Sequence, residues 1–243
     1  MKKDTDIAKI LSQHVEMNEF FTGGFAVKGA GGTAAQADKA AAAEASAELE
    51  KIAVAVRTCC KCGLGTSRTN AVPGEGNPNA RIMFVGEAPG ADEDAQGRPF
   101  VGRAGKLLDK IIAACGLKRG DVFIGNILKC RPPDNRDPKP EEITSCLPYL
   151  QRQIKVIRPE IIVALGAHAA RTLLETNKPI GQLRGRFWEY CPGISQTTVK
   201  LMPTYHPAYL LRNYSDDTRR KVWEDMKKVL AELGLPIPSY GQK

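Results

Sequence analysis

The chain has 243 residues and a formal net charge of +8, from 35 lysines and arginines against 27 aspartates and glutamates. Hydrophobic residues make up 42% of it, enough to bury the core of one domain of about 190 residues with a tail. We find no apolar run of about 18 residues and no signal-peptide pattern, which argues against a membrane-spanning or secreted protein. We therefore expect a reducing cytoplasmic location, no membrane partner, and anionic partners such as nucleic acid.

Residues 1–44 differ from the rest, because repeated glycines and an alanine-rich stretch interrupt any core pattern. We expect a flexible tail or linker there, then a helix over about 45–57 that opens a domain over 45–235. Residues 236–243 are expected to form a C-terminal tail. Within the domain, apolar runs predict strands over 82–85, 122–127, 161–165 and 199–202, and helical spacing predicts helices over 107–115 and 141–157, from 167, and after Ser215.

Alternating strands and helices with continuous apolar strands are typical of α/β proteins with a mainly parallel sheet. In such sheets, ligands bind beyond the carboxyl ends of the strands. The loop over 86–90, Asn126 and His206 all lie at or just past the end of a predicted strand. We therefore expect them to converge on one site.

Cys59 and Cys62 form a Cys-x2-Cys pair, and Cys130 and Cys146 follow later in the chain. Four thiolates suit either tetrahedral zinc or an iron–sulfur cluster. Zinc sites usually combine two closely spaced pairs, whereas Cys130 and Cys146 are widely separated, as a cluster permits. The residues alone leave zinc, a cluster and unligated cysteines open, and Cys60 is an alternative to Cys59.

Four side chains in the predicted loops and at the predicted strand ends are candidates for ligand binding or chemistry. Phe100 can stack on a ring or fill the core, and Asn126 offers both a donor and an acceptor or forms a turn. Glu87, in a Gly-Glu-Ala-Pro-Gly loop, can orient a water molecule or belong to an ordinary turn. His206 is the strongest candidate for chemistry among three histidines, whereas for His168 we expect a structural role.

Tyr209, Leu210 and Leu211 are apolar residues in a predicted loop that continues into Arg212. Apolar side chains on a basic loop can insert between the bases of a DNA duplex. The alternative is that these residues cover the core.

Taken together and in this order, the motifs resemble the family 4 uracil-DNA glycosylases over about residues 57–232. The resemblance rests on Cys59-x2-Cys62, Gly-Glu-Ala-Pro-Gly at 86–90, Gly-Arg-Pro-Phe-Val-Gly at 97–102, Asn126 to Lys129 before Cys130-Arg-Pro-Pro, Cys146, and His-Pro-Ala-Tyr-Leu from His206.

The resemblance implies a three-layer αβα sandwich around a four-stranded, mainly parallel sheet. It also implies a base-excision-repair enzyme that hydrolyses the N-glycosidic bond of uracil in DNA and leaves an abasic site. A structural [4Fe–4S] cluster would be held by Cys59, Cys62, Cys130 and Cys146. Glu87 and His206 would be catalytic, uracil would contact Glu87, Ala88, Phe100, Asn126 and His206, and the DNA wedge would be Leu210, Leu211 and Arg212. We expect a monomer associated with the nucleoid.

Three other classes compete with this interpretation. One is a nucleic-acid-binding module that keeps the fold without catalysis, although Glu87, Phe100, Asn126 and His206 argue against it. The others are a small iron–sulfur electron carrier and a zinc protein with four thiolate ligands.

Overall fold

A computed structural model describes residues 31–193, 198–213 and 215–238 of the chain. The chain forms two compact units, Met1–Ala41 and Ala42–Lys243, and the sites discussed below lie in the second unit. Residues 1–30 of the tail predicted over 1–44, and residues 239–243 of the predicted C-terminal tail, lie outside the described residues. Among the described helices, none combines the length and the apolar character that crossing a bilayer requires.

Four parallel strands form the centre of the sheet, in the order β3-β2-β4-β6. Two short strands extend it to six by pairing antiparallel, β1 with β3 and β5 with β6. The sequence predicts the four central strands, but the edge strands are too short to show a periodic pattern. The strands are β1 (Glu75–Gly76), β2 (Ile82–Gly86), β3 (Phe123–Asn126), β4 (Ile161–Leu165), β5 (Trp188–Tyr190) and β6 (Val199–Thr204).

The longer helices follow the predicted pattern, whereas the short helices α3, α4 and α8 were not predicted, and α4 lies where the acidic stretch was expected to be a loop. Two further differences concern α2 and α9. The sequence predicts a helix from about residue 45, whereas α2 begins at Gly31, so residues 31–44 are helical; their many alanines favour that conformation. The second difference is α9, which lies where a loop is predicted. The helices are α2 (Gly31–Arg57), α3 (Leu64–Ser67), α4 (Ala91–Gln96), α5 (Arg103–Ala114), η1 (Arg119–Asp121), η2 (Pro133–Asn135), α6 (Pro140–Ile157), α7 (Gly166–Leu174), α8 (Ile180–Leu183), α9 (Pro207–Arg212) and α10 (Asp216–Glu232).

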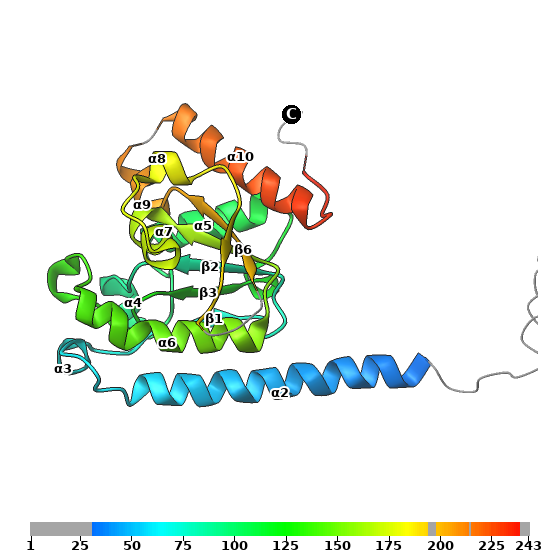
Figure 1. Ribbon diagram of the computed structural model, residues 1–243, viewed down its shortest axis with the longest axis horizontal. Coiled ribbons are helices and arrows are strands. Elements are labelled where there is room, and N and C mark those ends of the chain that lie inside the picture. The colour runs from blue at the N-terminus through cyan, green and yellow to red at the C-terminus, as the bar shows by residue number, and fades with distance from the viewer. Residues whose placement is uncertain (1–30, 194–197, 214, 239–243) are drawn as a thin grey trace, which may run out of the picture. The chain divides into compact units, whose positions relative to one another are not determined.

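Helices cover both faces of the sheet, giving three layers (Figure 1). Side chains alternate along each strand, so Met83 and Val85 pack with apolar residues of α6 and α7, whereas Ile82 and Phe84 pack with those of α5 and α10. Each fully buried apolar side chain contributes roughly 1.5–3 kcal/mol relative to exposure, so both faces stabilise the sheet strongly. The α/β sandwich expected from the sequence is confirmed.

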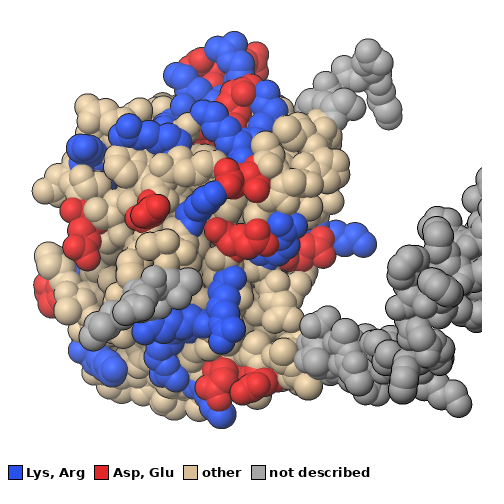
Figure 2. Space-filling model, turned by 45° about the vertical axis from the view of Figure 1, so that its right-hand side comes forward, with Lys and Arg blue, Asp and Glu red and all other residues tan. Residues whose placement is uncertain are grey.

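On the face of the molecule shown in Figure 2, basic and acidic side chains are mixed. Along α10, Asp217 pairs with Arg220 at 2.8 Å and with Lys221 at 2.6 Å, and Glu224 pairs with Lys227 at 2.6 Å. Much of the basic charge of α10 is thus neutralised locally, so net charge does not by itself locate a nucleic-acid surface.

Candidate active site and thiolate centre

The carboxyl ends of the parallel strands open onto a cavity of about 470 Å³. β2 ends at Gly86, β3 ends at Asn126, and β6 is followed closely by His206. The cavity is lined by the five residues for which ring binding is expected, Glu87, Ala88, Phe100, Asn126 and His206. The structure thus brings the 86–90 loop, Asn126 and His206 together, as their positions at strand ends predict, and it adds Phe100 from the segment between α4 and α5.

His206 is held in one orientation as the N-cap of α9. Its Nδ1 accepts a hydrogen bond from the backbone N–H of Ala208 at 3.0 Å. Burial lowers the pKa of His206 to about 4, assisted by the positive charge of Arg212 and opposed by Glu93. The ring is therefore neutral at pH 7, and because Nδ1 is an acceptor, the proton lies on Nε2. His206 presents an uncharged N–H donor at the cavity.

Phe100 forms an aromatic wall next to the imidazole. Its ring centroid lies 5.7 Å from that of His206, with 32° between the ring planes. The side chain is only 6% exposed, and the backbone has a φ of 51°, which is unusual for a non-glycine residue. The neighbouring carboxylate of Glu93 accepts hydrogen bonds from the N–H groups of Val101 and Gly102, each at 2.9 Å.

The carbonyl side of the same loop is held by Arg119. Its guanidinium donates to the carbonyl oxygen of Phe100 at 3.3 Å and also to that of Pro99. Arg119 also pairs with Asp109 at 2.7 Å. The left-handed conformation of Phe100 is thus fixed from both sides, which presents the ring as a preformed surface.

Asn126 is 2% exposed, and its Oδ1 has no hydrogen-bond partner among the described residues. Buried polar atoms are normally paired, so an unpaired acceptor at a cavity wall fits a ligand that brings an N–H donor. Gly86, its register partner in β2, leaves the space for this arrangement. A Cβ at Gly86 would lie 2.4 Å from Oδ1 of Asn126 and 2.6 Å from Cζ of Phe100.

Glu87 is half-buried beside two further titratable groups on the same cavity. Ligand-type atoms of Glu87, Asp137 and His168 all lie within 4.8 Å of one another, and Nε2 of His168 is 3.5 Å from Oδ1 of Asp137. Burial raises the pKa of Glu87, an effect that the neighbouring His168 reduces and Asp137 increases. His168, expected from the sequence to be structural, therefore belongs to the electrostatic environment of Glu87.

The expected wedge residues lie in a helix, not in a loop. Leu210 is only 4% exposed and packs in the core between the sheet, α5 and α10, so it cannot enter DNA without leaving that core. Leu211 is half-buried and Arg212 is exposed at the rim of the cavity. Leu210 is therefore a poor wedge in this conformation, whereas Leu211 and Arg212 remain available.

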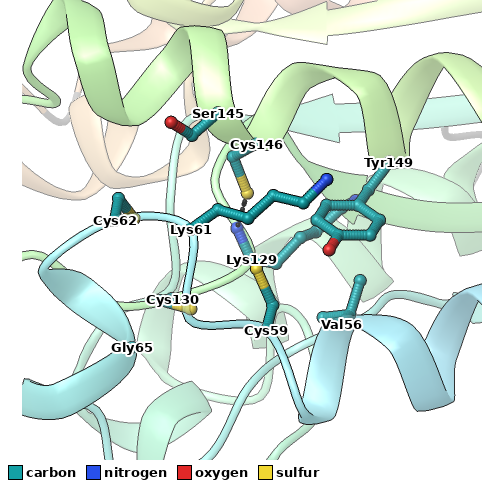
Figure 3. Close-up of a pocket in the computed structure, with 10 residues that line it drawn as sticks. All are labelled: Val56, Cys59, Lys61, Cys62, Gly65, Lys129, Cys130, Ser145, Cys146 and Tyr149. Carbon is teal, nitrogen blue, oxygen red and sulfur yellow. Dashed lines mark hydrogen bonds between the residues drawn. The ribbon is translucent and has the colours of Figure 1, made fainter.

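The four predicted cysteine ligands surround one small cavity (Figure 3). Cys59 and Cys62 come from the segment between α2 and α3, Cys130 follows β3, and Cys146 lies in α6. Cys60 does not line the cavity; it is exposed, and its thiol lies 3.7 Å from the carbonyl oxygen of Thr58. The alternative of Cys60 as a ligand in place of Cys59 is therefore not supported.

Polar hydrogens point at two of these sulfurs. Arg68 donates from Nη1 to Sγ of Cys130 at 2.9 Å, and the backbone N–H of Lys129 donates to Sγ of Cys146 at 3.1 Å. Such donors stabilise thiolates bound to metal. Burial raises the pKa of Cys146 to about 11, so the thiol stays protonated at neutral pH unless a metal displaces its proton. The set of four sulfurs with N–H donors fits a metal–thiolate centre.

Several supporting residues were not predicted from the sequence. Glu93 lies in an acidic stretch expected to be a solvated loop, and Arg119 and Lys129 have no distinctive pattern. For Glu93, the sequence does hold one indication. The residue comes shortly before the loop from Gly97 to Gly102, which contains Phe100 and in which backbone N–H groups need acceptors. The ion pairing of Arg119 and the burial of Lys129 depend on tertiary packing and have no local signature.

Comparison with known proteins agrees with this geometry. The Uracil DNA glycosylase superfamily matches residues 73–227. A type-4 uracil-DNA glycosylase of Sulfurisphaera tokodaii is 51% identical over 79% of this chain and 87% of its own length. A type-4 uracil-DNA glycosylase of Saccharolobus solfataricus is 50% identical over 76% of this chain and 86% of its own length. One of Thermotoga maritima is 48% identical over 74% of this chain and 92% of its own length.

Proposed function

We propose that this chain, which belongs to the type-4 group of the uracil-DNA glycosylase superfamily, removes uracil from DNA by hydrolysing the N-glycosidic bond. The products are free uracil and an abasic site, the first step of base excision repair. The observation that carries the proposal is the cavity in which a neutral N–H donor, an aromatic ring and an unpaired amide oxygen meet.

Recognition begins with extrusion of the nucleotide from the base stack, which costs a few kcal/mol. The extruded ring stacks on Phe100. Oδ1 of Asn126 accepts from uracil N3–H and its amide donates to O4, so the unpaired buried acceptor gains a partner. Cytosine offers an acceptor at N3 and a donor at the exocyclic amine, the opposite pattern, and is therefore excluded. The backbone at Glu87 and Ala88 forms the adjoining wall.

Cleavage of the glycosidic bond moves negative charge from the sugar to the base, because the bonding electrons leave with uracil. As the C1′–N1 bond breaks, the sugar becomes cationic and uracil anionic, and the Nε2–H of His206 donates to O2 to stabilise that anion. A neutral imidazole suits this role, because it stays a donor without giving up its proton. Glu87 accepts a proton from the attacking water, whose oxygen bonds to C1′, and its carboxylate also offsets the cationic sugar. Uracil N1 later takes up a proton from solvent.

The cofactor we propose is a [4Fe–4S] cluster bound by Cys59, Cys62, Cys130 and Cys146. When bound, it supplies a covalent link between α6, the segment after β3 and the segment before α3, and it takes no part in hydrolysis. The convergence of the four sulfurs and the N–H donors from Arg68 and Lys129 support this assignment. Zinc remains the alternative, and the colour of the purified protein separates them, because a cluster is brown and zinc is colourless.

The DNA backbone is expected to cross the mouth of the cavity. Arg136 and Arg212 line this cavity, and we propose that Leu211, which is half-buried next to Arg212 in the chain, fills the space left by the extruded base. We propose that the protein acts as a monomer on nucleoid DNA. We propose that the glycosylase domain spans residues 45–235.

The test is to incubate the purified protein with an oligonucleotide that carries one uracil, then to cleave abasic sites with alkali. We expect a nicked product at the uracil and none with cytosine or thymine at the same position. A matched reaction with Glu141→Gln, an exposed acidic residue of α6, should behave as the unmodified protein. Binding of the oligonucleotide without release of uracil would favour the inactive binding module instead.

A further inference from the structure

Lys129 is a buried lysine that lies between the ring-binding cavity and the four cysteine sulfurs. Its side chain is among the largest fully buried ones in the described part of the chain, with 1% exposure. Nζ donates to the backbone carbonyl of Asn126 at 2.9 Å and to Oε1 of Gln153 at 2.7 Å. Gln153 is held in turn by a hydrogen bond from Nε2 to the carbonyl of Pro73 at 2.7 Å.

The same residue also contacts a ligand sulfur. Its backbone N–H donates to Sγ of Cys146 at 3.1 Å, and the next residue is Cys130. The side chain of Lys129 therefore contacts Asn126, and the backbone of Lys129 contacts a sulfur of the thiolate centre. Among the described residues, this direct bridge between Asn126 and a cysteine ligand is formed by Lys129.

The charge on Lys129 has no carboxylate partner in the described residues. Its hydrogen bonds go to an amide carbonyl and a side-chain amide, and its own backbone N–H contacts Sγ of Cys146. A buried ammonium without an anion is strongly unfavourable, so such a residue requires a negative group nearby. An iron or zinc centre with four thiolate ligands carries a net negative charge and would supply it.

We propose that Lys129 is the internal counter-ion of the thiolate centre and couples that centre to uracil recognition by fixing the end of β3 at Asn126. The inference rests on the proposed function, because it requires a bound centre and a uracil site. Lys129 is a positioning residue, since it does not line the ring-binding cavity. The coupling is reciprocal: a ligand that orders Asn126 should also make the centre harder to lose.

The experiment measures how fast the purified holoprotein loses iron to a chelator, by the decay of its visible absorbance, with and without saturating free uracil. In the unmodified protein, uracil should slow the loss several-fold. In Lys129→Met, which removes both the charge and the donors, we expect loss about tenfold faster and no protection by uracil. Lys110→Met, an exposed lysine of α5, should match the unmodified protein.

A second variant separates charge from position. Lys129→Gln removes the charge but keeps a side-chain donor, so it should lose iron faster while retaining part of the protection by uracil; it also serves if Lys129→Met does not fold. The proposal is overturned if uracil leaves iron loss in the unmodified protein unchanged, or if a folded Lys129→Met variant behaves normally. Absence of uracil release by the unmodified protein would instead contradict the proposed function.

Discussion

The backbone N–H of Ala208 donates to Nδ1 of His206 at 3.0 Å, and this one contact leaves Nε2 as the nitrogen that carries the proton of the neutral ring. Because burial holds the pKa of His206 at about 4, the ring stays neutral across the physiological range. A proline at the first position of α9 leaves the next N–H free to make this contact. The local sequence His-Pro-Ala thus sets which nitrogen of His206 carries the proton, whereas burial keeps the ring neutral.

The first prediction concerns the titration of His206. Its pKa is lower in the folded chain than the ordinary 6.5, so the unfolded state binds more protons between these values. The contribution of His206 to folding stability is therefore complete above about pH 6.5 and declines as the pH falls toward 4. Nuclear magnetic resonance of labelled histidine should show a midpoint near 4 and a proton on Nε2. A midpoint near 6.5 would contradict this account.

The second prediction concerns Glu87. Burial raises its pKa above the ordinary 4.5, and activity requires the ionised carboxylate, so the rate should decline as the pH falls through that raised value. Glu87→Gln should lower the single-turnover rate by about 10²–10⁴-fold and remove this acid limb. Single-turnover rates over a range of pH provide the measurement. An unchanged acid limb in Glu87→Gln would assign it to another group.

A third prediction tests the shape of the ring-binding cavity. A Cβ added at Gly86 would collide with Asn126 and Phe100 at 2.4 Å and 2.6 Å. Gly86→Ala should therefore abolish most uracil release and destabilise the fold by about 1–3 kcal/mol, as measured by product formation and denaturant unfolding. Gly120→Ala is the matched control, because its Cβ would meet nothing within 4 Å. Normal turnover by Gly86→Ala would show that the cavity is more adaptable than proposed.

The fourth prediction separates the two leucines of α9. Leu210 is buried, so Leu210→Ala should cost about 2–5 kcal/mol of folding free energy, whereas Leu211→Ala should cost much less. If Leu211 fills the gap left by uracil, Leu211→Ala should slow release from double-stranded DNA more than from single strands. Equal effects of Leu211→Ala on the two substrates would remove Leu211 from the wedge.

Much of the fold could be predicted, because its main elements have strong local patterns. The strands ending at Gly86 and Asn126 are continuous apolar runs, and Ser215 caps α10 as its sequence suggests, accepting from the N–H of Thr218 at 3.2 Å. Since parallel strands share one carboxyl edge, the convergence of the 86–90 loop, Asn126 and His206 followed from their positions at strand ends.

The rest depends on tertiary contacts that have no local pattern. α9 is only six residues long, so its apolar residues can equally be interpreted as a loop. Glu93 gains its role from N–H groups several residues away, and His168 from Asp137, which lies on a different segment. The sequence indicates which residues face a cavity better than it indicates which residues hold them in place.

The most direct test of the central claim compares uracil release with DNA binding in His206→Ala. His206 is proposed to stabilise the departing base and not to hold the DNA backbone, so binding of a uracil-containing oligonucleotide should be nearly unchanged. Release of free uracil, followed by chromatography, should fall by about 10²–10³-fold, as expected for loss of one preorganised donor. Full release of uracil by a correctly folded His206→Ala protein would contradict the account.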